Sequence, residues 1–108
     1  MQNIEPDTNN KNAEEIFSEL NLETAKIAWN ELERFFAAGS LIWVDASLDL
    51  VQVAVEIAQD NKQYIEEQMN LDTIKPVEDE QAKSWQDTQP NLWAVVVKPW
   101  VLVQEKDF

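Results

Sequence analysis

The stretch LIWVDASLDLVQVAVEIA, residues 41–58, decides the fold of this chain. Its four leading apolar residues predict a short buried strand, which a turn at residues 45–47 joins to a helix. The polar residues of that helix share one narrow stripe: Asp49, Gln52, Glu56 and Gln59. Apolar side chains cover the rest of the circumference, far more than the face of ~100° that a surface helix shows. We therefore expect a core helix that is covered on several sides, or one whose burial is completed by another subunit.

The composition predicts a single acidic globular domain. The chain has 108 residues, 44% of them hydrophobic, and its net charge of -13 comes from 21 acidic and 8 basic residues. A field of that sign repels phosphate backbones and anionic lipid surfaces, so we expect neither a nucleic acid nor a membrane as partner. A basic protein partner or a bound cation stays open.

The residue types that are missing exclude several chemistries. The sequence has no cysteine and no histidine, which removes disulfides, thiol nucleophiles and imidazole bases. Its single glycine cannot build a glycine-rich phosphate-binding loop. No cofactor is therefore expected, and any catalysis would have to use carboxylates, serine or lysine. There is no signal peptide and no apolar run of ~18 residues, so a cytoplasmic location is expected.

The first half of the chain reads as a tail followed by two helices. Residues 1–12 are scattered polar residues and predict a disordered tail, which leaves 13–108 as the domain. Residues 13–20 predict a short amphipathic helix. Asn21 is then the expected N-cap of a longer helix over 22–38.

The second half alternates between helical and strand patterns. We expect a helix over 62–69, with Tyr64, Ile65 and Met69 facing inward, and another over 78–85. The first of these is either continuous with the core helix through a kink or starts afresh. Residues 73–77 predict an edge strand because Pro76 cannot donate a ladder hydrogen bond. Residues 92–97 predict a central strand. Lys98 and Pro99 either turn the chain into a hairpin with 100–104 or bend one long strand, and the proline favours the hairpin.

These elements predict an α+β fold in one domain. The sheet has three to four strands, formed by Leu41–Val44, residues 92–97 and Trp100–Gln104, with 73–77 at an edge. We expect the core helix to lie on this sheet, with the helix over 22–38 packed alongside it.

Asp45 and Asp49 are the candidate metal ligands. Asp45 follows a buried strand and precedes a helix, a position where many α/β enzymes hold Mg²⁺, and Asp49 lies one helical turn further on. Aspartate is also a favoured N-cap, and either Asp45 or Ser47 is expected to cap the core helix. No catalytic residue can be assigned.

Trp100 and Ile27 are the candidate interface residues. Five tryptophans lie mostly at apolar-stripe positions, where they fill cores, but Trp100 sits beside Pro99 in a predicted turn. Ile27 falls off the apolar stripe of its predicted helix, so it contacts either the N-terminal helix or a partner.

Three segments resemble a known family of small bacterial proteins. They are NLETAKIAWNELERFFAAGSLIWVD (residues 21–45), LDLVQVA (48–54) and LWAVVVKPWVLVQ (92–104). The similarity covers about residues 15–105, and the family is domain-of-unknown-function family number 2288. This resemblance implies a complete, stand-alone bacterial domain and assigns no activity, cofactor or catalytic residue.

Three hypotheses about function follow from these observations. The first is a non-enzymatic protein-interaction module of a bacterial cytoplasm, with a protein partner or a second copy of the chain to cover its excess apolar surface. The alternative is a divalent-cation-dependent enzyme or cation-binding domain centred on Asp45 and Asp49. A third idea is an acidic surface that mimics nucleic acid toward a basic protein.

Overall fold

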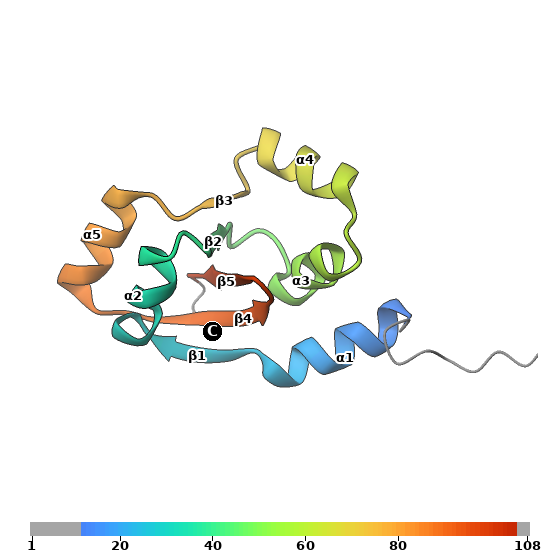
Figure 1. The fold of residues 1–108 in the computed structure, drawn as a ribbon, viewed down its shortest axis with the longest axis horizontal. Coiled ribbons are helices and arrows are strands. Elements are labelled where there is room, and N and C mark those ends of the chain that lie inside the picture. Colours follow the sequence, from blue (N-terminus) through green and yellow to red (C-terminus); the bar gives the residue numbers. More distant parts are fainter. Residues whose placement is uncertain (1–11, 106–108) are drawn as a thin grey trace, which may run out of the picture.

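Five strands form one mixed sheet in the computed structural model, which describes residues 12–105 (Figure 1). The strands are β1 (Ala25–Ala28), β2 (Leu41–Val44), β3 (Ile74–Pro76), β4 (Asn91–Val97) and β5 (Trp100–Gln104). Their spatial order is β1-β4-β5-β2-β3. Only β2 and β5 run parallel, and the other three pairs are antiparallel.

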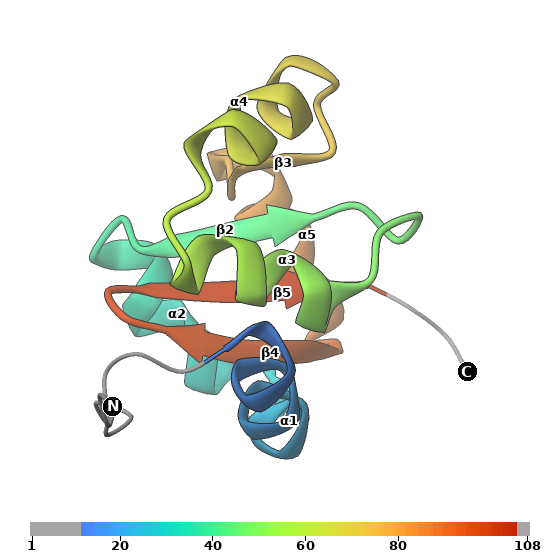
Figure 2. The ribbon, with the colours of Figure 1, turned by 90° about the vertical axis from the view of Figure 1, so that its right-hand side faces the viewer.

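Helices cover both faces of this sheet (Figure 2). They are α1 (Ala13–Glu23), α2 (Trp29–Ala37), α3 (Leu50–Ala58), α4 (Lys62–Asn70) and α5 (Asp79–Thr88). In Figure 2, α1, α3 and α4 lie in front of the sheet, and α2 and α5 lie behind it. The side chains accordingly form two separate hydrophobic clusters, one on each face.

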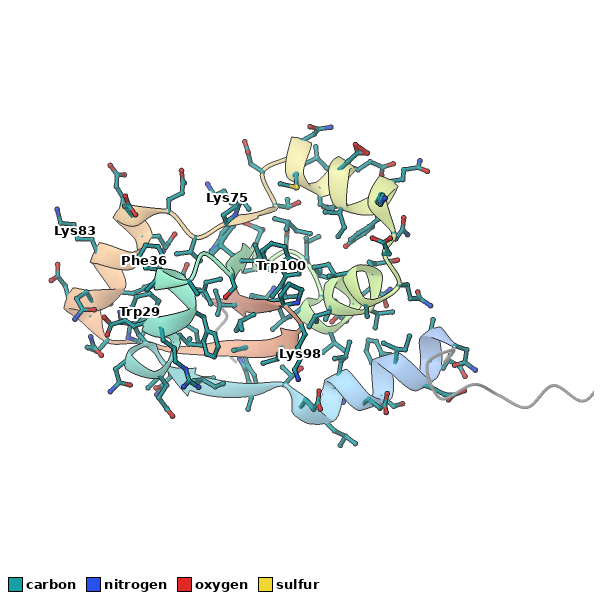
Figure 3. All side chains as sticks on the ribbon, in the orientation of Figure 1. Trp29, Phe36, Lys75, Lys83, Lys98 and Trp100 are labelled. Atoms are coloured by element: carbon teal, nitrogen blue, oxygen red, sulfur yellow. The ribbon has the colours of Figure 1, made fainter. Side chains whose placement is uncertain are left out.

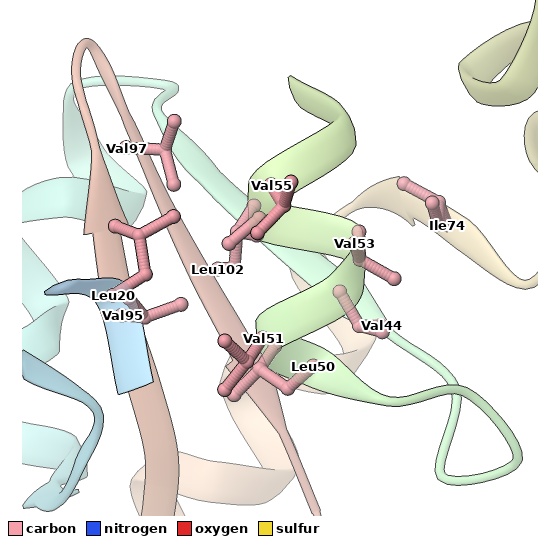
Figure 4. Packing of buried hydrophobic residues seen from close by; sticks show 11 residues of the cluster. Leu20, Val44, Leu50, Val51, Val53, Val55, Ile74, Val95, Val97 and Leu102 are labelled. Atoms are coloured by element: carbon pink, nitrogen blue, oxygen red, sulfur yellow. The ribbon is translucent and has the colours of Figure 1, made fainter. Parts of the chain in front are cut away.

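The core helix is confirmed as α3. Its buried residues are Leu50, Val51, Val53, Ala54 and Val55, and they pack against Leu20 of α1 and against Val95 and Leu102 of the sheet (Figure 4). The broad apolar arc is therefore covered by elements of the same chain. The strand predicted before it is also confirmed, since β2 has a neighbour on both sides.

The start of α3 corrects the predicted cap. Neither Asp45 nor Ser47 caps the helix. Asp49 does, because its carboxylate accepts the backbone N–H groups of Val51 at 3.0 Å and of Gln52 at 3.3 Å. The helix thus begins at Leu50, two residues later than the apolar pattern suggests, and Asp45 is left to shape the preceding loop.

The helix predicted over residues 22–38 is correct only in its second half, where residues 29–37 form α2. Asn21 lies inside α1, which ends where the Thr24 hydroxyl donates to the carbonyl of Leu20 at 2.7 Å. The next four residues form strand β1 and pair with β4. Four residues of helical periodicity cannot outweigh this pairing, because without β1 the long apolar strand β4 would expose an unpaired edge.

Strand β1, which was not predicted from the sequence, also changes how the helices are arranged on the sheet. The sheet has five strands where three to four were expected, and α2 packs with α5 on the face opposite α3 instead of alongside it. The place beside α3 is taken by α1. The α+β class and the single domain hold.

Three open points of the second half are settled by the backbone. Asp60 adopts φ of 57° and breaks the chain after α3, so α4 starts afresh with Asn61 as its N-cap. Lys98 and Pro99 turn the chain into the β4–β5 hairpin. Strand β3 lies at the sheet edge, as its proline predicted.

The tail predicted for residues 1–12 falls outside the described residues except for Asn12, which caps α1.

Candidate functional site

An apolar groove lies between α4 and the end of the sheet that carries the hairpin. Its volume is about 540 Å³, within the range of ligand pockets. Most of its exposed surface belongs to carbon atoms. The residues that line it are Gly39, Ile42, Ile57, Asp60, Lys62, Ile65, Glu66, Met69, Ile74, Lys75, Pro76 and Trp100.

The groove stays open because α4 packs loosely. None of the residues of α4 is fully buried. Tyr64 and Ile65 reach the cluster around α3 and are half-buried there, whereas Met69 on the last turn remains 47% exposed. The helix neighbours α3 and β3, and Figure 1 shows it at the outer end of the molecule. The expected inward position of Met69 is therefore not reached.

The two ends of α4 are fixed by local hydrogen bonds. At its start, the Asn61 side chain accepts the N–H of Tyr64 at 3.2 Å and donates to Glu56 of α3 at 2.9 Å. After its end, Asp72 adopts φ of 59° and the Thr73 hydroxyl donates to the carbonyl of Gln68 at 3.0 Å. These bonds hold the chain reversal into β3 and so keep both walls of the groove in place.

Trp100 forms the hairpin wall of the groove. It is the first residue of β5 and pairs with Val97 of β4 (Figure 3). Its side chain is 38% exposed, more than that of any other tryptophan. Trp100 is thus the most exposed of the five tryptophans, and its role at an interface stays a prediction.

Charged residues stand at the rim of the groove. Asp60, Lys62 and Glu66 are all exposed. Lys75 has its charge engaged elsewhere, because its ammonium group lies 3.4 Å from Glu78 and 5.4 Å from the ring centre of Trp43. The groove therefore combines an apolar floor with two exposed carboxylates at its rim, those of Glu66 on α4 and of Asp60 in the turn before it.

Asp45 and Asp49 each accept hydrogen bonds from the nearby backbone. The Asp45 carboxylate accepts the N–H of Ser47 at 2.9 Å. Hydrogen bonding by the side chain of Ser47, and then by its backbone, holds the pKa of Asp45 below its usual value. A second pocket of about 310 Å³ is lined by Asp49, but by neither Asp45 nor Glu56. Within residues 12–105, no three Asp or Glu side chains gather as a metal would require. Each of the two carboxylates thus has a local backbone role.

Gln104 is a buried polar residue that the sequence analysis passed over. It is only 3% exposed, and its side-chain amide donates to the carbonyls of Asp45 at 2.9 Å and Leu48 at 2.8 Å. Both carbonyls belong to the loop that leads into α3. The strand end therefore anchors this loop, and the signal was a single glutamine after three apolar residues of a strand.

Tyr64 of α4 packs half-buried against the cluster around α3 and is not a lining residue of the groove. Burial raises its pKa, and the negative charges of Glu56 and Asp49 raise it further. Ile27, the other candidate interface residue, lies in β1 and packs partly buried against the cluster under α2. The structure therefore brings Trp100 and α4 together and leaves Ile27 on the opposite face.

Comparisons with known proteins place this fold in a family. The family described as "Protein of unknown function (DUF2288)" matches residues 15–105. The chain belongs to this family. A structure of similar fold is the NMR solution structure of PA1075 from Pseudomonas aeruginosa, with 41% sequence identity, a TM-score of 0.76 and coverage of 87% of each chain. No curated protein matches. Among the described residues, no helix is long and apolar enough to cross a membrane.

Proposed function

We propose that this DUF2288 member is a non-enzymatic protein-interaction module of the bacterial cytoplasm that docks a partner in the groove beneath α4. The observation that carries the proposal is the exposed apolar groove itself, with Met69 and Trp100 on its walls. Large side chains left open to water around a concave apolar surface are characteristic of binding sites. An apolar side chain of a partner that enters the groove would release water from the groove and from its own surface.

The apolar surface that is open to a partner differs from the one expected from the sequence, which was the apolar arc of α3. The arc of α3 is buried against its own chain, so it needs no second copy. The exposed large hydrophobic residues nearest the groove are Met69, Leu71 and Trp100. Leu71 directly follows α4 and is 68% exposed, although it is not among the residues that line the groove.

A photo-crosslinking experiment in bacterial cells tests the proposal. A photoreactive residue at Met69 should give a discrete adduct, and Trp100→Ser should abolish that adduct because it removes the opposite wall. The matched control places the same residue at Glu33, which is equally exposed on α2 and faces away from the groove. An adduct of twice the chain mass would identify a second copy as the occupant.

Two results would contradict the proposal. The first is the absence of an adduct at Met69. The second is an identical adduct pattern at Met69 and at Glu33, which would mean nonspecific collision. Circular dichroism of the purified Trp100→Ser protein checks that loss of the adduct does not reflect unfolding.

A further inference from the structure

Resting on the proposed function, we infer the chemistry of the partner: a segment in which lysine or arginine residues flank one or more large apolar side chains. The groove would take the apolar anchors, and the carboxylates at its rim would face the cationic flanks. This is a statement about the occupant of the groove, so it can fail while docking in the groove still holds.

The surroundings of the groove are acidic, although its lining holds lysines as well as acids. Residues 56–72, which run from the last turns of α3 through α4, contain five acids and one lysine. Asp60 and Glu66 line the groove itself, together with Lys62 and Lys75. The ammonium group of Lys75 lies 3.4 Å from Glu78, which offsets its charge in part. Neither Asp60 nor Glu66 has an ion-pair partner within residues 12–105, so both are available to a partner.

The acids also lie in the right place relative to the apolar floor. Glu66 follows Ile65 on α4 and precedes Met69 by three residues, so the carboxylate and the thioether stand on adjacent turns of one helix. Asp60 marks the other end of the groove, after Ile57. A bound segment whose anchor contacts Ile57, Ile65 or Met69 would therefore bring its flanking residues within reach of a carboxylate.

A second copy of this chain fits the groove poorly. It would bring a further net charge of -13 toward an acidic rim. The most exposed apolar residue elsewhere is Leu22, at 84%, and it lies next to Glu23 on α1. Like charges that face each other across an interface disfavour it, so the charge complementarity favours a cationic partner.

Three labelled helical peptides test the inference by fluorescence anisotropy. All carry leucine and phenylalanine at every third or fourth position, and the remaining positions are lysine in one, glutamate in the second and glutamine in the third. We expect the lysine peptide to bind at least about tenfold more tightly than the glutamate peptide, with an affinity that falls as salt is added.

Charge-matched variants separate the groove from the overall acidity. Asp60→Asn with Glu66→Gln should weaken the lysine peptide about three- to tenfold, because each lost contact is partly desolvated. Glu31→Gln with Glu33→Gln removes the same charge from exposed positions on α2 and should change binding less than about twofold. Asparagine tolerates the left-handed backbone of Asp60, so the first pair should fold.

The possible outcomes test the cationic preference and the docking groove separately. Equal binding of all three peptides, lost in Met69→Ser and kept in Leu22→Ser, would overturn the cationic preference and leave the docking groove intact. Binding of the lysine peptide that both charge-matched pairs weaken equally would also overturn it, as a nonspecific effect of net charge. Binding of no peptide, or binding unaffected by Met69→Ser and Trp100→Ser, would overturn the groove as the docking site.

Discussion

At the scale of single residues, Gln104 shows how one buried polar side chain fixes a loop. Its amide satisfies two carbonyls, those of Asp45 and Leu48, that would otherwise lie next to apolar side chains. Gln104→Leu removes both donors and keeps the size of the side chain. We expect the free energy of unfolding to fall by about 1–3 kcal/mol, measured by urea denaturation.

Gln59→Leu is the matched control for this substitution. Gln59 is exposed after the end of α3, so its replacement should change stability by less than about 0.5 kcal/mol. A Gln104→Leu protein as stable as the control would mean that the loop carbonyls find other partners, and would remove the anchoring role of Gln104.

Asp49 and Asp45 should differ in what they contribute. Asp49→Ala removes the cap of α3 and should cost about 1 kcal/mol, whereas Asp45→Ala removes one exposed hydrogen bond and should cost less. Because the folded pKa of Asp45 is lowered, its contribution is present above its ordinary pKa of 3.8 and is lost as the pH falls through the folded value. Urea denaturation of both variants between neutral and acidic pH measures the contribution of each aspartate to the free energy of unfolding.

The same two variants test the metal site predicted from sequence. The local roles of both carboxylates lead us to expect no rise in melting temperature with millimolar Mg²⁺, Mn²⁺ or Ca²⁺. A rise that disappears in Asp45→Asn would instead establish cation binding, since a ligand bound only by the folded state must stabilise it.

Tyr64 reports on the contact between α3 and α4. It is the single tyrosine of the chain, so its phenol can be titrated by ultraviolet absorbance without assignment. We expect a midpoint above 10.0, and Glu56→Gln should lower it only in part, because burial is the larger cause. Stability linked to this group should be retained below the ordinary pKa and lost as the pH rises through the folded value. A midpoint at 10.0 would mean that Tyr64 is not buried against the cluster around α3.

At the scale of elements, α4 is held more weakly than the other described helices, each of which has at least one buried residue. It buries no residue completely, whereas β5 has four buried residues in a row. Native-state hydrogen exchange should therefore show the amides of α4 opening at a lower free energy than those of β4 and β5. Amides of α4 that are as protected as those of β5 would contradict this view of the groove wall.

Much of the element order could be predicted because it follows from local patterns. The apolar run of β2, the apolar arc of α3 and the proline of β3 each carry their own signal. Strand β1 does not. Residues 25–28 fit a helical stripe, and their extended form depends on pairing with β4, more than sixty residues later in the chain. Such long-range pairing overrides local propensity.

The groove could not be predicted for a similar reason. Its walls come from α4, β3 and the β4–β5 hairpin, and no sequence pattern states how far α4 stands from the sheet. Trp100 was identified as exposed because it neighbours Pro99. Met69 was placed inward because its spacing from Ile65 is helical, but the helix ends before that face meets the core.

At the scale of the whole molecule, one chain buries its own core on both faces of the sheet. With that core closed and a net charge of -13, we expect the purified protein to scatter light as a monomer of 12.5 kDa at micromolar concentration. A stable dimer at low salt that Trp100→Ser converts to monomer would instead make a second copy the occupant of the groove.

The central claim is that partners dock in the groove between α4 and the sheet. Nuclear magnetic resonance tests it most directly, through the amide chemical shifts of the labelled protein as the lysine-flanked peptide is added. We expect the largest changes in amide chemical shift in α4, in β3 and at Trp100, with little change in α2 and α5. Largest shifts on α2 and α5, or in the loop between Asp45 and Asp49, would contradict it.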